Sequence, residues 1–381
     1  MHIHCILEKV SYKPTLCDSL ETCTMKEFLS GKAFEHASFL LDYDGAEIAV
    51  SQWVSPKRTR SYPYARVYNT MNKSKRVTII PFLKDEGKDG DRDFIQWDTV
   101  SFMSLLGVYV IIGYYNKAEK SEREKQKDKH KITNQEFDYK YLKKKLDELD
   151  AFKSDALHWN LAQLENLEEV AEKAKQSYLK ISEQTGIELH NVRGINKRIE
   201  ILKKKAEVFK TFSRELAASA QNREFQTVQP KESTIQQKAK ISIKNYLGGE
   251  YHLTVDELII EEDSLFLIEK KHSKHSDIPS MEDIKDGFLK MILFSNLSQV
   301  HINGKKFKHF PVLGLTSEKY FERLDNCSGE GQGEKGKKIF NEGTVNGVLV
   351  CLMNDSDKKV QEQILERYLK KKSKTMEKTP L

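Results

Sequence analysis

The stretch Tyr251–Lys271 (YHLTVDELIIEEDSLFLIEKK) constrains the fold more than any other part of the sequence. It contains two strand-like apolar runs that meet at Glu261-Glu262-Asp263. Side chains of a strand alternate between its faces, and the second run is apolar on both faces, which predicts a strand deep in a sheet. Glu269 and Lys271 share one face at the end of this strand. We therefore expect them to emerge together at one edge of a sheet, beside Asp256 of the preceding run.

Length and composition describe a soluble protein with a heavily charged surface. The chain has 381 residues, enough for two or three domains, and 38% of its residues are hydrophobic while 31% are charged. Lysine and arginine together number 63 against 57 acidic residues. This mild excess favours an anionic partner such as nucleic acid. A lysine-rich soluble protein without such a partner explains the charge equally well.

Cysteine usage and hydropathy predict a cytoplasmic protein that does not enter a membrane. The five cysteines are odd in number and form no Cys-x-x-Cys pair, and no secretory segment is expected before them, which fits a reducing compartment. The longest apolar run, Thr99–Gly113, is shorter than the ~20 residues of a membrane-spanning helix. We expect it to form a buried helix followed by a buried strand. The sequence has no Gly-x-x-x-x-Gly-Lys-Ser/Thr motif, so no nucleotide cofactor is expected.

Residues 1–116 are predicted to form a mixed α/β region that recognises DNA. Ala46–Val54 and Arg76–Leu83 have the pattern of strands. Between them, cations stand beside tyrosines, and arginine and lysine suit phosphates and guanine edges. The alternative is a solvated loop next to tyrosines that fill a core. The candidate DNA-contacting residues are Lys57, Arg58, Arg60 and Arg66.

Residues 117–230 are predicted to be a charged linker followed by long antiparallel helices. The run Lys117–Lys131 has almost no apolar residue and indicates a solvated helix or a mobile linker. From Asn134 to about Phe225 the apolar spacing is helical, and Gly186 is a plausible break between helices. We expect these helices to act as a spacer or to join two subunits.

Residues 231–381 alternate helices and strands in a way that predicts an α/β (α+β) domain with a mixed, partly parallel sheet flanked by helices. The Tyr251–Lys271 hairpin lies between two predicted helices, and two short buried strands follow, separated by a glycine-rich loop. A basic helix closes the chain. The expected elements are the helices Ser233–Leu247, Ser280–Leu297 and Asp357–Lys371, the strands Phe310–Leu315 and Gly347–Met353, and the loop Ser328–Lys337.

The charges of the hairpin have the chemistry of a phosphodiester hydrolase. Two carboxylates on neighbouring strands, Asp256 and Glu269, repel each other unless a cation lies between them. Oxygen ligands suit a hard ion, and Mg²⁺ binds through one or two carboxylates, waters and substrate phosphates. Lys271 points the same way as Glu269, where it can hold or deprotonate the attacking water while the metal stabilises charge on the phosphorus.

Asp256, twelve further residues and then Glu269-Lys270-Lys271 at the end of an apolar strand resemble the motif of the PD-(D/E)xK nuclease superfamily. Most type II restriction endonucleases share this fold. The resemblance covers about residues 233–353. It implies that Asp256 and Glu269 bind the metal, that the backbone carbonyl of Lys270 adds a ligand, and that Lys271 activates water.

The motif departs from the family pattern in two places. Val255 stands where the family has the proline that gives the motif its name, a position that binds nothing. Several members add an acid from the preceding helix, and here only Glu232 or Glu250 is near that place. The alternative to a nuclease site is a structural hairpin with an exposed aspartate and a Glu-Lys-Lys end.

The resemblance implies a magnesium-dependent type II restriction endonuclease that cuts double-stranded DNA at a specific sequence. A homodimer would place one centre on each strand of a symmetric site. In a variant of this hypothesis the N-terminal region recognises DNA separately and the enzyme cuts at a distance, as type IIS enzymes do. The alternatives are a repair or recombination nuclease of the same fold, or a non-catalytic DNA-binding or helical scaffold protein.

Overall fold

The computed structural model describes residues 1–56, 63–122, 131–190, 193–203, 239–245, 250–317 and 333–353. The chain divides into two compact units: unit 1 consists of Met1–Leu16 and Ala220–Leu381, and unit 2 of Cys17–Ser219. Three regions were expected from the sequence: 1–116, 117–230 and 231–381. The structure instead groups the first sixteen residues with the C-terminal part, and residues 117–219 with the rest of the N-terminal region.

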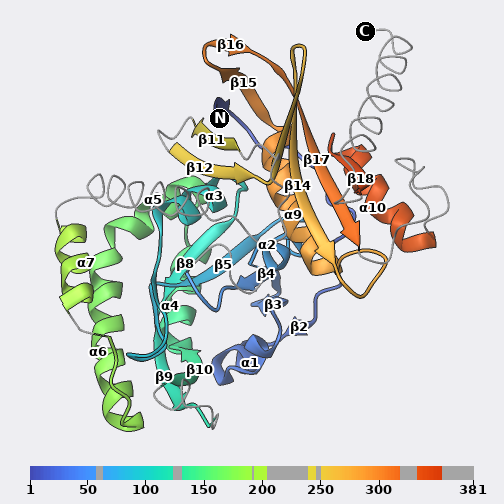
Figure 1. Ribbon diagram of the computed structural model, residues 1–381. Helices are drawn as coiled ribbons and strands as arrows, with labels where there is room; N and C mark the ends of the chain where they lie inside the picture. The colour runs from blue at the N-terminus through green and yellow to red at the C-terminus, as the bar shows by residue number, and fades with distance from the viewer. Residues whose placement is uncertain are drawn as a thin grey trace. The chain divides into compact units, whose positions relative to one another are not determined.

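Unit 1 is a mixed α/β unit built on two sheets. One sheet has the strand order β12-β11-β1-β15-β16 and the other has the order β13-β14-β17-β18. Two described helices accompany them (Figure 1). The elements are β1 (His2–Leu7), β11 (Ala239–Asn245), β12 (Glu250–Val255), β13 (Glu257–Glu261), β14 (Ser264–Ser273), α9 (Met281–Ser295), β15 (Leu297–Ile302), β16 (Lys305–Lys306), β17 (Lys308–Ser317), α10 (Gly333–Val345) and β18 (Leu349–Met353).

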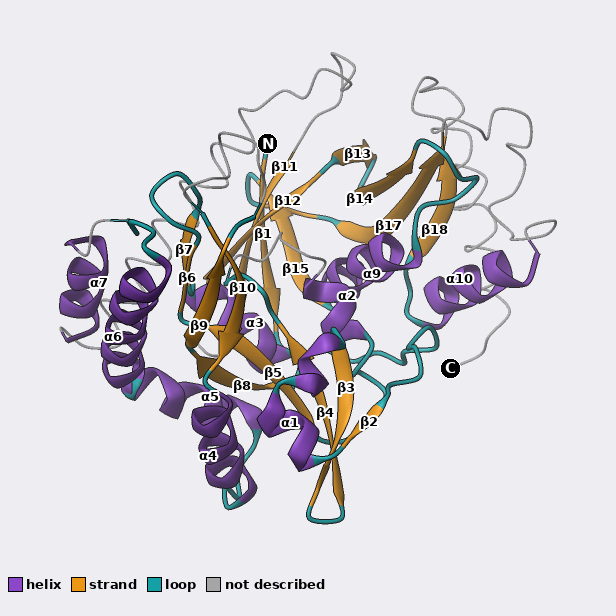
Figure 2. Ribbon diagram, turned by 90° about the horizontal axis from the view of Figure 1, so that it is seen from below, coloured by secondary structure: helices purple, strands orange, loops and turns teal. Residues whose placement is uncertain are grey.

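The four-stranded sheet of unit 1 contains part of the predicted hairpin: Glu257–Glu261 form β13, whereas Tyr251–Val255, expected in the same strand, belong to β12 in the other sheet. β13 and β14 pair antiparallel, with Glu262 at a positive φ of 53° in the two-residue turn. β14 then pairs parallel with β17, and β17 pairs parallel with β18, so that Glu269, Leu313 and Val350 lie side by side. α9 connects β14 towards β17 and α10 connects β17 to β18, and both lie on the same side of the sheet (Figure 2).

Two glycines let these helices approach the sheet closely. A Cβ on Gly287 of α9 would lie 2.6 Å from Leu313 Cδ1, and a Cβ on Gly343 of α10 would lie 2.5 Å from Val350 Cγ2. Real Cβ atoms do not approach so closely, so glycine is needed at both positions. Both helices therefore cover the face of the sheet that also carries Glu269.

The opposite face of this sheet is a buried apolar cluster. Phe266 and Ile268 of β14 alternate with Leu265, Leu267 and Glu269, so they point to the other side. The cluster consists of Phe266, Ile268, Val312, Leu349 and Cys351. β14 is thus buried on both faces, as its apolar sequence predicted.

Unit 2 is also mixed α/β. Its main sheet has the order β2-β3-β4-β5-β8, and two small antiparallel sheets pair β6 with β7 and β9 with β10. Its strands are β2 (Thr22–Cys23), β3 (Ser38–Tyr43), β4 (Ala46–Gln52), β5 (Arg76–Pro81), β6 (Leu83–Asp85), β7 (Arg92–Phe94), β8 (Tyr109–Gly113), β9 (Tyr115–Lys120) and β10 (Ile132–Phe137). Its helices are α1 (Met25–Ser30), the 3-10 helix η1 (Lys32–Glu35), α2 (Pro63–Tyr68), α3 (Trp97–Leu105), α4 (Tyr139–Asp150), α5 (Ala156–Glu165), α6 (Leu167–Thr185) and α7 (Arg193–Lys203).

Most of the predicted elements are confirmed. The strands at Ala46–Val54 and Arg76–Leu83 correspond to β4 and β5, and Thr99–Gly113 contains most of α3 and all of β8. The two short C-terminal strands correspond to β17 and β18, and the amphipathic helix after the hairpin is α9. Gly186 ends α6 in the left-handed conformation, at a φ of 65°. The basic helix expected at Asp357–Lys371 lies outside the described residues.

Three predictions of secondary structure were wrong. The helix expected at Ser233–Leu247 is strand β11 over Ala239–Asn245, because alanine and isoleucine alternate there with polar residues and are buried. The charge run from Lys117 begins in strand β9 rather than in a helix or linker, because β9 pairs with β10. The loop expected at Ser328–Lys337 becomes helix α10 from Gly333 onward.

Candidate active site

The hairpin of unit 1 brings the Asp256 carboxylate close to Glu269. The paired register of the hairpin ends at Glu257, opposite Ile268, and Asp256 forms a bend just before β13. The backbone N–H of Asp256 donates to the Ile268 carbonyl at 3.0 Å, and the N–H of Lys270 donates to Asp256 Oδ2 at 2.8 Å. The Asp256 carboxylate is therefore fixed against the neighbouring strand.

Glu269 is buried between two lysine ammonium groups. Its side chain is enclosed, with 7% of the residue exposed. Lys290 Nζ lies 2.5 Å from Oε2, and Lys271 Nζ lies 3.4 Å from Oε1. Burial alone would raise the pKa of Glu269, but Lys290 and Lys271 outweigh it and hold the pKa below the usual value. Glu269 is thus an ionised carboxylate at neutral pH.

Asp256 experiences the opposite balance. Burial, together with the charge of Glu269 nearby, raises the pKa of Asp256 to about 6, although Lys290 and the Lys270 N–H act against the shift. The two carboxylates lie close together, and the lysine ammonium groups stabilise the negative charge of Glu269 more than that of Asp256. The negative charge of an ionised Asp256 would attract a further cation placed beside it.

Helix α9 supplies the rest of the site. Ser280 caps its N-terminus by accepting from the Asp283 N–H at 3.1 Å, and an apolar stripe packs the helix on the sheet. Asp286 and Lys290 are one turn apart on this helix and point to the hairpin: Lys271 Nζ lies 3.1 Å from Asp286 Oδ2. Burial raises the pKa of Asp286, although Lys271 opposes this shift.

Gly287 brings the helix close to Lys271. A Cβ at this position would lie 3.1 Å from Lys271 Cε, in addition to its overlap with Leu313. The stem of Lys271 therefore lies directly on the backbone of α9. Desolvation lowers the pKa of Lys271, but Glu269 and Asp286 reverse this effect and raise the pKa above the usual value. Lys271 is an ammonium ion that two carboxylates hold in place.

The site contains the three residues predicted from sequence and two that were missed. Asp256, Glu269 and Lys271 come together as expected, while Asp286 and Lys290 were not predicted. Both were visible as charges one turn apart, at the border of the apolar stripe of an amphipathic helix. Of the two acids considered as a third ligand, Glu232 lies outside the described residues, and Glu250 begins β12 in the other sheet of unit 1.

Lys270 lies at the back of the site. Its side chain makes an ion pair with Glu257, with Nζ 3.1 Å from Oε2. Lys271 points to the face of Glu269, and Lys270, as its neighbour in the strand, points to the other face. The contribution of Lys270 to the site is thus its backbone, which already binds Asp256 through the N–H.

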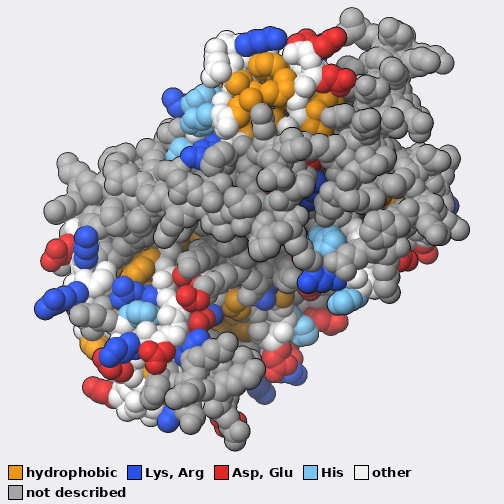
Figure 3. Space-filling model, in the orientation of Figure 1, with side chains coloured by type: hydrophobic (Ala, Val, Ile, Leu, Met, Phe, Trp, Pro, Cys, Tyr) orange, Lys and Arg blue, Asp and Glu red, His pale blue; other side chains and the backbone are white. Residues whose placement is uncertain are grey.

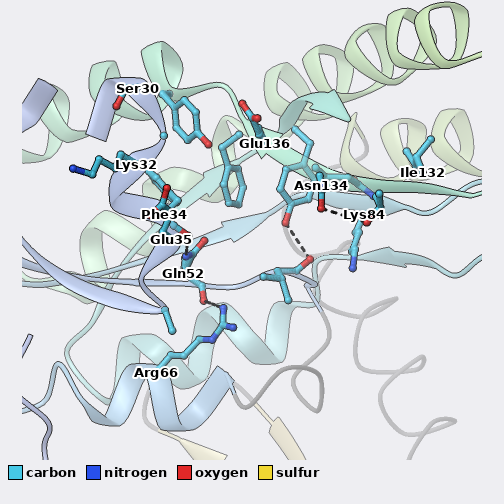
Figure 4. Close-up of a pocket in the computed structure, with 18 of the residues that line it drawn as sticks. Ser30, Lys32, Phe34, Glu35, Gln52, Arg66, Lys84, Ile132, Asn134 and Glu136 are labelled. Atoms are coloured by element: carbon cyan, nitrogen blue, oxygen red, sulfur yellow. Dashed lines mark hydrogen bonds between the residues drawn. The ribbon is translucent and has the colours of Figure 1, made fainter. Parts of the chain in front are cut away.

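The predicted DNA-contacting residues belong to unit 2. Lys57, Arg58 and Arg60 lie outside the described residues. Arg66 is on α2, and its Nη1 donates to the Gln52 carbonyl at 2.9 Å. It lines a pocket of about 750 Å³ that also contains rings of Phe34 and Tyr139 (Figure 4). On the face shown in Figure 3, basic and acidic side chains of the described residues are interspersed.

Two carboxylates are a donor set for a hard divalent cation, although both oxygens of Glu269 already face lysine ammonium groups. Such an ion takes oxygen ligands, and Mg²⁺ commonly uses one or two carboxylates and completes its shell with water and phosphate oxygens. Asp256 and Glu269 provide this pair. In the described part of the chain, no group of three or more histidine, cysteine, aspartate or glutamate side chains is placed to bind a metal. A cage made only of protein side chains is therefore not found among those residues.

Comparison with known proteins gives no relative. No protein-family model matches the sequence, no curated protein matches it, and no solved structure matches the fold. Among the described residues, no helix is both long enough and apolar enough to cross a membrane.

Proposed function

We propose that the protein is a magnesium-dependent endonuclease that hydrolyses phosphodiester bonds of double-stranded DNA at a specific sequence, as a type II restriction enzyme does. One observation carries the proposal: at the end of a hairpin the Asp256 carboxylate accepts from the Lys270 N–H, next to Glu269, and Lys271 is on the same face as Glu269. This is the arrangement that the PD-(D/E)xK motif requires of its two metal-binding acids and its lysine.

The strand order supports the same proposal. A restriction-endonuclease-like core has an antiparallel hairpin followed by a helix and a parallel strand, and β13, β14, α9 and β17 occur in this order. One element differs. The family's helix before the hairpin was expected at Ser233–Leu247, and strand β11 takes part of that place.

Each residue of the site has a role in this proposal. Asp256 and Glu269 would hold Mg²⁺, with the carbonyl of Lys270 as a further ligand, and the bound ion would supply stabilisation of the negative charge on the phosphate. Lys271 is held as an ammonium by Glu269 and Asp286, so it orients the attacking water by donating to it rather than by removing its proton. Lys290 keeps Glu269 ionised.

The partners follow from the reaction. The substrate is duplex DNA, no nucleotide cofactor takes part, and the enzyme acts in the cytoplasm. Two chains form a homodimer, and unit 2 contributes sequence recognition. Arg66 and the cations at 57, 58 and 60 are the candidate contacts to phosphates and guanine edges.

Cleavage of long duplex DNA tests the proposal. The purified chain is incubated with phage-sized DNA and Mg²⁺ beside Asp256→Asn and Lys271→Ala, and Asp263→Asn serves as a matched control in the exposed turn of the same hairpin. We expect discrete fragments from the wild type and the control, and none from the other two variants. Progressive degradation would indicate an exonuclease or a repair nuclease. The absence of cleavage with Mg²⁺ or Mn²⁺ would leave a non-catalytic DNA-binding protein.

A further inference from the structure

Unit 2 repeats the strand and helix order of the site-bearing sheet. In unit 1, β13 and β14 form a hairpin, α9 leads towards the parallel strand β17, and α10 leads to the parallel strand β18. In unit 2, β3 and β4 form a hairpin, α2 leads to the parallel strand β5, and α3 precedes the parallel strand β8. The sheet order β13-β14-β17-β18 corresponds to the β3-β4-β5-β8 part of the five-stranded sheet of unit 2, in which β2 is added beside β3.

The two hairpins correspond residue by residue as well. Each has a two-residue turn, Glu262-Asp263 in unit 1 and Asp44-Gly45 in unit 2, with a positive φ at Glu262 and Asp44. Tyr43 is paired with Ala46 across one turn, as Glu261 is paired with Ser264 across the other. The register can therefore be counted outwards from the turns without a choice of alignment.

This count identifies what stands at the catalytic positions in unit 2. Asp256 and Glu269 lie six residues before and six residues after their turn, with Asp256 in a bend one residue outside the ladder, and the same steps lead to Ser38 and Ser51, which are paired with each other. Lys271, eight residues after its turn, corresponds to Trp53. No carboxylate and no lysine therefore occupies the three positions.

Trp53 and Ser51 also occupy the corresponding face of the sheet. Lys271 meets the crossover helix α9, and Trp53 meets the crossover helix α2, where its ring lies 6.4 Å from that of Tyr64. Ser51 is fully buried, and its hydroxyl donates to Thr78 Oγ1 of the adjacent strand at 3.0 Å. The position that corresponds to Glu269 is therefore taken by a serine whose hydroxyl is hydrogen-bonded to the neighbouring strand.

We propose that unit 2 is a second copy of the nuclease core whose hydrolytic site is closed, so that each chain has one hydrolytic centre and makes one cut. This inference rests on the proposed function. A carboxylate pair is needed to hold the metal, and two serine hydroxyls, one of them buried and bonded to a threonine, do not replace it. Unit 2 then contributes to the reaction by binding DNA and does not hydrolyse it.

Nicking of supercoiled plasmid DNA with Mg²⁺ tests the inference on the full chain. Glu269→Gln disables unit 1, while Ser38→Ala and Ser51→Ala change the corresponding positions of unit 2. We expect Glu269→Gln to lose nicking of both strands by about a hundredfold or more, as loss of a catalytic group does. Both serine variants are expected to nick within about twofold of the wild type, since their residues lie outside the reacting centre.

Three outcomes would contradict parts of this scheme and can be told apart. Nicking by Glu269→Gln at a rate near that of the wild type would show a second centre and overturn the inference. Loss of nicking in Ser38→Ala, with an unchanged melting temperature, would do the same. A wild-type chain that nicks nothing would overturn the proposed function first, and the inference with it.

Discussion

Replacing Asp256 by asparagine is expected to stabilise the metal-free protein while it abolishes cleavage. Burial and the charge of Glu269 raise the pKa of Asp256 from 3.8 to about 6 in the folded chain. Each pKa unit corresponds to about 1.4 kcal/mol, so the ionised carboxylate costs about 3 kcal/mol of folding free energy at neutral pH. Asparagine removes this charge, and its amide oxygen can still accept from the Lys270 N–H.

The effect must depend on pH in a defined direction. The folded chain binds the Asp256 proton more tightly than the unfolded chain, so the wild type loses stability as the pH rises from about 4 to about 6. The stability difference between Asp256→Asn and the wild type is therefore near zero below about pH 4. It grows through this window and stays at its full value above it.

Hydrogen exchange of the β14 and α9 amides measures this stability difference within unit 1. A global denaturation curve is less suitable, because it would combine the unfolding of both units. The samples contain a chelator and cover pH 4 to 8, and Asp263→Asn in the exposed turn is the control. Adding Mg²⁺ should then stabilise the wild type and leave Asp256→Asn unchanged. A variant that is less stable than the wild type at pH 7.5, or a difference that is flat with pH, would refute the reasoning.

Three further changes test other contacts of the site. Lys290→Ala leaves the buried Glu269 with one cation and should cost about 3 kcal/mol or more above pH 5. The loss should shrink in acid, because the lowered pKa of Glu269 contributes stability only where the group is ionised, and hydrogen exchange of the β14 and α9 amides at pH 4 and 7.5 checks this. Gly287→Ala forces a Cβ against Leu313 and Lys271, and should cost about 1–3 kcal/mol and slow cleavage, which melting and nicking rates measure together. Mixing the wild type with excess Glu269→Gln should accumulate nicked plasmid circles if two chains act on one duplex, whereas unchanged amounts of linear product would contradict this.

The fold and site were predictable where one segment of sequence contains the whole signal. The hairpin follows from two apolar runs around a charged turn, and α9 follows from its Ser280 cap and its apolar stripe. Asp256, Glu269 and Lys271 lie within this local pattern, and strand alternation places Glu269 and Lys271 on one face.

The rest depends on partners far away in the sequence. β11 was taken for a helix because a serine precedes it and glycines follow it, but its alternation is completed by pairing with β1, about 240 residues earlier. Lys290 was not predicted as a site residue, since only the packed structure places it against Glu269. The repeat in unit 2 was hidden for a related reason: Ser38, Ser51 and Trp53 correspond to the site by register and share no residue type with it.

The central position of β1 in its sheet has a consequence for synthesis on the ribosome. β1 lies between β11 and β15, so the first strand to be made must wait for neighbours encoded more than 230 residues later. At 5–20 residues per second this delay is roughly 10 to 50 s, during which the nascent β1 has both edges unpaired. Unit 2 is encoded entirely between β1 and β11 and can fold during the delay. Unit 1 is therefore completed after unit 2, and a chain that stops before Ala239 leaves β1 without either neighbour.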